Sequence, residues 1–264
     1  MFSKMRMLWE VLVLMFTAMF SKVSSGRGGQ MNKPPCSRGK EAAPVDAVSY
    51  CLSWRAAVET NNVLPWRTVP PQCMSYVENY MLGGQYESDL DVIMEQISTY
   101  LDGIVLSEDG MDAWILDIDD TCLSNLLYYK DKRFGCDPFD RTAFKKWMLK
   151  GECPAVPAVL ELFRKLVSSG FKVFLLTGRD EARFGQVTLD NLHDQGYLGY
   201  ERLIMRSEAN KGQGAVVFKS EIRRGIEGEG YRIWGNVGDQ WTDLLGDCSG
   251  TRTFKIPNPM YFIS

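Results

Sequence analysis

Three carboxylates fall within four consecutive positions of the chain, in the run Asp117-Ile118-Asp119-Asp120-Thr121. They follow the apolar run 113–116, which predicts a short strand buried on both faces. Open parallel sheets place their ligand sites at the carboxyl ends of such strands. Because like charges this close raise one another's pKa, a site that keeps them ionised needs a cation, and oxygen ligands favour Mg²⁺. The alternative is an acidic turn in which Asp or Thr caps the next helix.

Two later strands are also predicted to end in polar residues. The apolar run 171–176 leads into Thr177-Gly178-Arg179, and the run 231–237 leads into an acid pair, Asp239 and Asp243. A hydroxyl group and further carboxylates suit phosphoryl transfer, because positioning and charge neutralisation dominate that reaction.

Taken in order, the acid cluster, Thr177, Lys219 and the acid pair resemble the four motifs of haloacid dehalogenase-type hydrolases. The chain is similar over longer stretches to the plant acid phosphatase and vegetative storage protein group, from about Tyr50 to Phe262. The stretches that carry this likeness are Trp114–Tyr129, Leu176–Arg183, Asn236–Gly246, Asn191-Leu192 and Ser53-Trp54-Arg55.

The resemblance implies catalytic roles for Asp117, Asp119, Thr177 and Lys219. Asp117 would attack phosphorus and form an aspartyl phosphate, which divides one difficult step into two. Asp119 would protonate the leaving alcohol and then activate water. Residues i and i+2 of an extended segment share a side, so both acids can face one phosphate.

The same resemblance implies the binding residues. The substrate-binding set would be Thr177, Gly178, Arg179 and Lys219. The Mg²⁺ ligands would be Asp117, the backbone carbonyl of Asp119 and Asp239, with Asp243 in support.

Two of these assignments have simpler structural alternatives. Asp239 and Asp243 would then belong to a solvated turn. Lys219, like the nearby Lys211, would extend from a helix surface into solvent.

Three further polar residues are open to interpretation. Arg179 either contacts substrate or pairs with the acid cluster. Asp120 is expected to make local hydrogen bonds rather than to bind metal. His193, the only histidine, lies on a predicted helix away from the motifs, and we expect it to have a structural role.

Strands and helices alternate through the second half of the chain, which predicts an α/β fold with a doubly wound parallel sheet, the haloacid dehalogenase-like Rossmannoid arrangement. The expected strands are 113–117, 171–176, 202–205, 231–237 and 251–256, and the expected helices between them are 155–169, 181–195 and 213–226. Three earlier helices, within 53–59, 72–81 and 86–104, are expected to form a packing layer.

A segment rich in aromatic residues, about 124–152, interrupts the alternation after the first strand. It is expected to be a small helical cap insert. Either it packs around a small core of its own, or it forms a lid that offers substrate an aromatic wall. Because the insert is small, we expect a weakly covered site that accepts varied phosphate esters.

The first 25 residues differ in composition from the rest of the chain. Lys4 and Arg6 precede an apolar stretch, and small residues follow it, which is typical of a signal peptide over 1–25 with cleavage near Gly26. A membrane anchor is the alternative, but the stretch is short and Glu10 interrupts it. We expect a flexible leader over 26–49 and one phosphatase domain over 50–264.

Seven cysteines suit a secretory chain in which most are paired. Cys51 and Cys73 flank one helical segment and Cys136 and Cys153 flank another, so these two bridges are expected, whereas Cys122 beside the acid motif is expected to be a buried thiol. The sequence does not fix the connectivity.

The composition limits the classes of molecule that the protein is expected to bind. The formal net charge is −3, and no basic stripe suggests nucleic acid. The expected function is a Mg²⁺-dependent acid phosphatase of the secretory pathway, extracellular or vacuolar, that acts on small phosphorylated substrates. The alternative is a vegetative storage protein on the same fold with weak or no activity. No stable membrane anchor is expected, and a homodimer is left open.

Overall fold

A computed structural model describes residues 46–263, so the expected signal peptide and most of the expected leader lie outside the described residues. The fold is an α/β fold built on five parallel strands in the order β3-β2-β1-β4-β5, which confirms the predicted fold class. The strands are β1 (Asp112–Leu116), β2 (Lys172–Asp180), β3 (Arg202–Arg206), β4 (Arg232–Gly238) and β5 (Arg252–Lys255).

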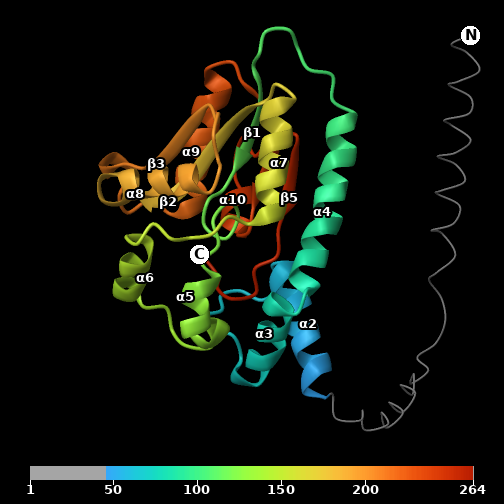
Figure 1. Ribbon diagram of the computed structural model, residues 1–264, viewed down its shortest axis with the longest axis vertical. Helices are drawn as coiled ribbons and strands as arrows, with labels where there is room; N and C mark the ends of the chain where they lie inside the picture. The colour runs from blue at the N-terminus through green and yellow to red at the C-terminus, as the bar shows by residue number, and fades with distance from the viewer. Residues whose placement is uncertain (1–45, 264) are drawn as a thin grey trace, which may run out of the picture. The chain divides into compact units, whose positions relative to one another are not determined.

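Helices cover both faces of the sheet (Figure 1). On one face, Trp114 and Leu116 of β1 share a core with α4 (Gln85–Asp102), α7 (Pro157–Ser168) and α8 (Glu181–Asp194). On the other face, Ala113 and Ile115 pack against α9 (Ala215–Gly228). The alternation of side chains along β1 therefore buries both faces of the central strand, as its unbroken apolar sequence predicts.

The strand boundaries differ from expectation at one functionally important place. β2 continues through Thr177, Gly178 and Arg179 to Asp180 instead of ending at Leu176. It does so because Asp180 still pairs with Arg206 of β3 after a shift in register. The side chains of the second motif therefore lie on a strand.

The predicted N-terminal helical layer is present as α2 (Ala47–Glu59), η1 (Pro71–Cys73), α3 (Met74–Leu82) and α4. α2 begins earlier than the sequence suggested, because Asp46 caps it by accepting a hydrogen bond of 2.9 Å from the backbone N of Ser49.

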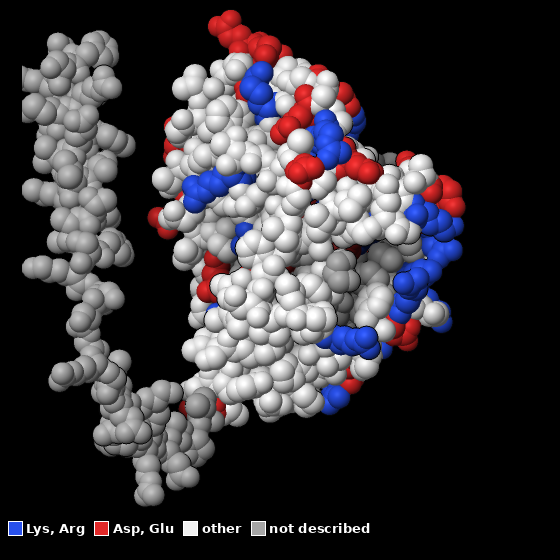
Figure 2. Space-filling model, turned by 180° about the vertical axis from the view of Figure 1, so that it is seen from behind, with Lys and Arg blue, Asp and Glu red and all other residues white. Residues whose placement is uncertain are grey.

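Among the described residues, no helix is long and apolar enough to cross a membrane. Acidic and basic side chains are interspersed on the face that Figure 2 shows, without an unbroken basic stripe.

The insert after β1 contains α5 (Leu126–Asp131), η2 (Arg133–Gly135) and α6 (Arg141–Met148), which lie beyond the carboxyl ends of the strands (Figure 1). The aromatic side chains of the insert pack on one another, as the first of the two alternatives expects. Tyr128 and Phe144 meet edge to face with ring centroids 5.0 Å apart, and Phe139 lies 5.3 Å from Phe144. Phe139 and Phe144 also line the cavity over the acid motif.

One of the two expected disulfides is present. Cys51 and Cys73 are bonded, with Cα atoms 5.4 Å apart, and join α2 to η1. The expected bridge between Cys136 and Cys153 is wrong, because both are free thiols. The thiol of Cys136 lies 3.9 Å from the carbonyl oxygen of Pro70, whereas that of Cys153 lies 3.6 Å from Asn125 Oδ1.

A close approach between β1 and β4 explains why position 235 is occupied by glycine. Gly235 of β4 lies opposite Trp114 of β1, and a Cβ atom on Gly235 would lie 2.2 Å from the indole ring. Trp114 has no room to move, because it stacks on Phe254 at 5.8 Å and meets Phe171 edge to face at 6.2 Å.

We therefore expect Gly235→Ala to lower the free energy of unfolding by about 1–3 kcal/mol through overpacking. Gly225→Ala is the matched control, because Gly225 is exposed on α9 with nothing near its Cβ position, and helix propensity should make that change stabilising by about 0.5–1 kcal/mol. Urea unfolding of both variants measures the difference. Equal effects in the two variants would contradict the packing argument.

Candidate active site

The sheet brings the predicted motifs together at one edge. Asp117 follows β1, and its backbone N donates to the carbonyl of Val237 in β4 at 3.0 Å. Thr177 lies at the same edge of β2, and Asp239 follows β4. β1 lies between β2 and β4, so the three strand ends are neighbours. Asp117, Gly178 and Asp239 from these strand ends line a cavity of about 490 Å³, and Lys219 also lines it.

Lys219 lies in the interior, which rules out the solvent-exposed alternative. It comes from α9 and is 5% exposed. Its Nζ contacts Asp117 Oδ1 and lies 2.6 Å from Asp243 Oδ1. Burial alone would lower its pKa, but attraction to these two carboxylates outweighs burial and raises the pKa of Lys219. Lys211, by contrast, is exposed and pairs with Glu208 at 2.8 Å.

Three buried carboxylates face one another in this site. One ligand oxygen each from Asp117, Asp239 and Asp243 lies within 4.8 Å of the others. Burial, followed by repulsion from Asp243, raises the pKa of Asp117 well above its usual range, and burial with repulsion from Asp243 and Asp120 raises the pKa of Asp239 to about 8. These acids are therefore not a solvated turn.

The donor set of this cluster fits a divalent cation. Three carboxylates against the single ammonium of Lys219 leave two negative charges in a buried space when all are ionised. All three ligands are hard oxygens, which is the set that Mg²⁺ prefers. Buried charge without compensation is costly, so cation binding would relieve the repulsion that raises the pKa of Asp239.

The side chain of Asp119 turns to a different partner. Arg179 holds both of its oxygens, through Nε at 3.1 Å and through Nη2 at 2.8 Å to Oδ1. Thr177 Oγ1 donates to the same carboxylate at 3.3 Å. Burial would raise the pKa of Asp119, but the charge and hydrogen bonds of Arg179 outweigh it, so the pKa is lowered. Of the two interpretations of Arg179, the one seen in the structure is the ion pair with the acid cluster, through Asp119.

Asp120 makes local hydrogen bonds, as expected. It has a left-handed backbone with φ of 56°, and it accepts from the backbone N of Asn125 at 2.8 Å and from the hydroxyl of Tyr261 at 2.8 Å. Burial raises its pKa to about 6. His193 lies on α8, as expected, and is not among the residues that line the cavity. It is exposed, and the Tyr200 hydroxyl lies 3.3 Å from its Nε2.

Sequence reasoning missed three amides that hold the acids, those of Asn125, Gln240 and Asn258. Asn125 donates to Asp119 at 3.0 Å and accepts from Trp147 of α6 at 3.0 Å, so it links the insert to the acid. Asn258 donates to Asp239 at 2.7 Å. The position of Asn125 close to the acid run was a usable signal, but nothing local marks Asn258, which meets Asp239 only through folding.

Part of the cavity lining is apolar and largely aromatic. This aromatic wall includes Tyr129, Phe139, Phe144, Met148 and Phe184. Phe139 is 53% exposed, so part of its ring reaches solvent. Arg67 and Arg206 add positive charge to the lining. The cavity therefore combines charged groups with an apolar surface.

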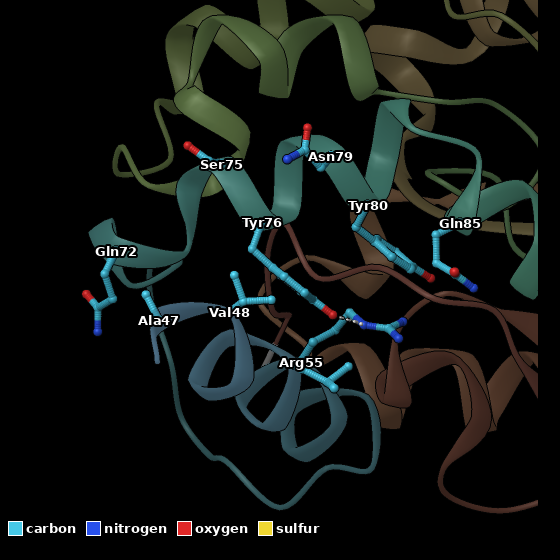
Figure 3. A pocket seen from close by; sticks show the side chains of 10 residues that line it. Ala47, Val48, Arg55, Gln72, Ser75, Tyr76, Asn79, Tyr80 and Gln85 are labelled. Carbon is cyan, nitrogen blue, oxygen red and sulfur yellow. Dashed lines mark hydrogen bonds between the residues drawn. The ribbon is translucent and has the colours of Figure 1, made fainter. Parts of the chain in front are cut away.

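A larger cavity of about 690 Å³ lies between α2, α3 and the start of α4, and contains none of the motif residues (Figure 3). Its charged group is already paired. Arg55 lies 3.0 Å from Asp89, donates to the hydroxyl of Tyr76 at 3.2 Å, and stacks its guanidinium 4.1 Å above the Tyr80 ring. Cavity size therefore does not identify the active site, and the acid cluster does.

The arrangement defines a class of protein: a hydrolase of the haloacid dehalogenase type, with an aspartate after the central strand, a lysine against it and further acids beside them. The chain belongs to the HAD superfamily, subfamily IIIB (acid phosphatase), whose family model matches residues 37–264. It is an acid phosphatase of that subfamily, which confirms the family expected from the sequence.

Named relatives span most of the chain. It is 46% identical over 213 residues to acid phosphatase 1 of Solanum lycopersicum, covering 81% of this chain and 83% of the relative. It is 39% identical to the stem 28 kDa glycoprotein of Glycine max, covering 81% and 84%, and 36% identical to vegetative storage protein 2 of Arabidopsis thaliana, covering 81% and 80%. The class C acid phosphatase of Bacillus anthracis shares the fold, with a TM-score of 0.60 at 20% identity over 72% of this chain and 85% of that one.

The raised pKa of Asp239 predicts how stability depends on pH when metal is removed. Its pKa is about 8 in the folded chain against an ordinary 3.8, so between these values the folded state holds a proton that the unfolded state has lost. Stability should therefore fall as the pH rises through this window.

Denaturant unfolding in chelator at pH 6, 7 and 8 measures this slope. Asp239→Asn should make the slope shallower, because the amide does not titrate, while Asp117, whose pKa is also raised, continues to contribute. The interval from pH 6 to 8 is chosen because the pKa of Asp120, about 6, affects mainly the lower part of the window. An unchanged slope in the variant would show that other groups cause it.

Proposed function

We propose that this acid phosphatase hydrolyses phosphate monoesters through a covalent phosphoryl group on Asp117, with Mg²⁺ as cofactor. The observation that carries the proposal is the contact of Lys219 with Asp117 inside a buried cluster of carboxylates. The ammonium aims the carboxylate and opposes the rise in its pKa that burial and the neighbouring acids cause, and a bound cation would favour the ionised form further, which a nucleophile requires. Asp119 lies two residues on, at the same cavity.

In the first step, an oxygen of Asp117 forms a bond to phosphorus while the bond between phosphorus and the ester oxygen breaks. Asp119 gives its proton to that departing oxygen, so that a neutral alcohol leaves. The side chain of Asp119 is the least buried of the acids here, at 23% exposed, which suits a group that must reach the leaving oxygen.

In the second step, Asp119 takes a proton from a water molecule as the water oxygen attacks phosphorus. The bond from Asp117 to phosphorus then breaks, which regenerates the carboxylate and releases inorganic phosphate. Because Arg179 lowers the pKa of Asp119, the protonated form needed for the first step is scarce near neutral pH, and it becomes more abundant as the pH falls. This relation supports an acidic optimum.

Thr177, the backbone N of Gly178 and Lys219 are proposed to bind the phosphoryl oxygens. Asp117, Asp239 and the backbone carbonyl of Asp119 would hold Mg²⁺, with Asp243 in support. When bound, the cation would neutralise charge on the phosphoryl group and on the carboxylates. Arg179 orients Asp119 in this scheme, so it acts on substrate through that acid.

The lining of the cavity supports broad substrate use. An apolar wall that includes the exposed Phe139 offers contact area without a ring of hydrogen-bonding groups, so it favours aryl and apolar alkyl phosphates without selecting one of them. The natural substrate would be a small phosphorylated compound.

A second function, storage with weak activity, is favoured by the 36% identity to a protein named vegetative storage protein 2. The retention of Asp117, Lys219 and the acid pair favours catalysis. Tissue abundance and turnover number separate the two roles: a storage protein would be abundant with a low turnover number.

Passage through the secretory pathway, to the cell exterior or the vacuole, completes the proposal. The disulfide between Cys51 and Cys73 suits an oxidising compartment, and relatives are named stem glycoproteins. N-terminal sequencing of the protein from its tissue should find a start near Gly26. A start at Met1 would contradict a cleaved signal peptide.

Two isosteric variants separate the roles of the acids. Asp117→Asn should abolish turnover and also covalent incorporation of phosphate, because the nucleophile is lost. Asp119→Asn should retain part of the first step with p-nitrophenyl phosphate, whose leaving group needs little protonation, but should stall at the second step. Rapid quench with labelled substrate should therefore trap more phosphoenzyme in the Asp119 variant than in wild type. Labelled phosphoenzyme in the Asp117 variant would exclude that residue as the nucleophile.

Dependence on metal is tested separately. Exhaustive chelation should abolish hydrolysis of p-nitrophenyl phosphate, and added Mg²⁺ should restore it. Asp239→Asn should raise the Mg²⁺ concentration needed for half-maximal activity, whereas its thermal unfolding in chelator should show an intact fold. Full activity after chelation would remove Mg²⁺ from the mechanism.

A further inference from the structure

The chain beyond β5 returns to the active site. Ile256 pairs with Gly238, its backbone N donating to that carbonyl at 3.0 Å, and the following residues lie beside α5 of the insert (Figure 1). There Tyr261 stacks on Tyr129, with ring centroids 4.8 Å apart and an interplanar angle of 10°. Segment 257–263 therefore lies against both the loop that carries Asp239 and the insert.

Asn258 is the point at which this segment meets an acid. It is 3% exposed, and its Nδ2 donates to Asp239 Oδ2 at 2.7 Å. Its other groups are also engaged: Oδ1 accepts from the backbone N of Met260 at 3.0 Å, and its own backbone N donates to Glu59 at 2.9 Å. These contacts fix which way the amide points, so its N–H group is aimed at Asp239.

Gln240 provides a second amide on the same oxygen, with Nε2 2.7 Å from Asp239 Oδ2. Its own orientation depends on the same segment, because its Oε1 accepts from the backbone N of Ile263 at 3.0 Å. Thr121 is the one described donor to Oδ1, at the longer distance of 3.3 Å. Oδ2 of Asp239 thus accepts two short hydrogen bonds from amides, whereas Oδ1 accepts a single longer hydrogen bond from Thr121.

We propose that segment 257–263 is a positioning element of the active site, and that Asn258 is the positioning residue for the metal ligand Asp239. This inference rests on the proposed Mg²⁺-dependent function. Two amide donors on one oxygen restrict rotation of the carboxylate and favour its ionised form, which is the form that binds a cation. Outer hydrogen-bond partners of this kind typically change metal affinity by about 10–100-fold when they are removed.

The test is calorimetric titration of Mg²⁺ into metal-free protein, without substrate, so that binding is measured apart from activity. Asn258→Ala should weaken Mg²⁺ binding by about 10–100-fold. Tyr261→Phe is the matched control from the same segment: it loses a hydrogen bond of 2.8 Å to Asp120 but makes no contact with Asp239, and should bind Mg²⁺ as wild type does. Thermal unfolding in chelator records the loss of stability in each variant.

A purely structural role for Asn258 gives a different pattern. Loss of the turn at Met260 would lower stability with and without metal by the same amount and leave Mg²⁺ affinity unchanged, and that result would overturn the inference. If Asn258→Ala does not fold, Asn258→Ser replaces it, because a hydroxyl can still accept from Met260 but is too short to reach Asp239. Failure of wild type itself to bind Mg²⁺ would instead overturn the proposed metal dependence, and this inference with it.

Discussion

The contact between Lys219 and the two carboxylates of Asp117 and Asp243 is the constraint on which the site depends. It joins α9 on one face of the sheet to the end of β1 and to α10 (Trp241–Leu244), the short helix that follows β4. A buried ammonium with two buried acids is stable only as a set, since removal of one member leaves uncompensated charge in the interior. The contact also needs β1 and β4 to be adjacent, so the strand order and the chemistry depend on each other.

A second ion pair, between Arg179 and Asp119, divides the acids into two functional groups. Asp117, Asp239 and Asp243 share one ammonium and retain excess negative charge, whereas Asp119 has a guanidinium to itself. Acids that line the same cavity therefore have opposite pKa shifts, raised in Asp117 and Asp239 and lowered in Asp119. Different environments for similar side chains are how one site obtains both a metal-binding group and a proton-transfer group.

Much of this arrangement could be predicted from the sequence, because its signals are local. Apolar runs that end in polar residues located the strands, and the parallel sheet then required their carboxyl ends to meet. What could not be predicted depends on contacts between distant segments. The sulfur of Cys153 lies against Arg179, so its spacing from Cys136 was misleading. The choice of Asp119 as partner of Arg179 and the approach of Asn258 to Asp239 are also products of tertiary packing, with no periodicity to reveal them.

The disulfide between Cys51 and Cys73 is separate from all of this chemistry. It closes a loop between α2 and η1 in the helical layer, and neither sulfur contacts any acid of the site. Such a crosslink contributes about 3 kcal/mol by restricting the unfolded chain. The resistance of the folded chain to unfolding and the chemistry at the sheet edge therefore depend on different parts of the structure. A change at the crosslink can alter how long the folded molecule persists without touching the residues that line the active site.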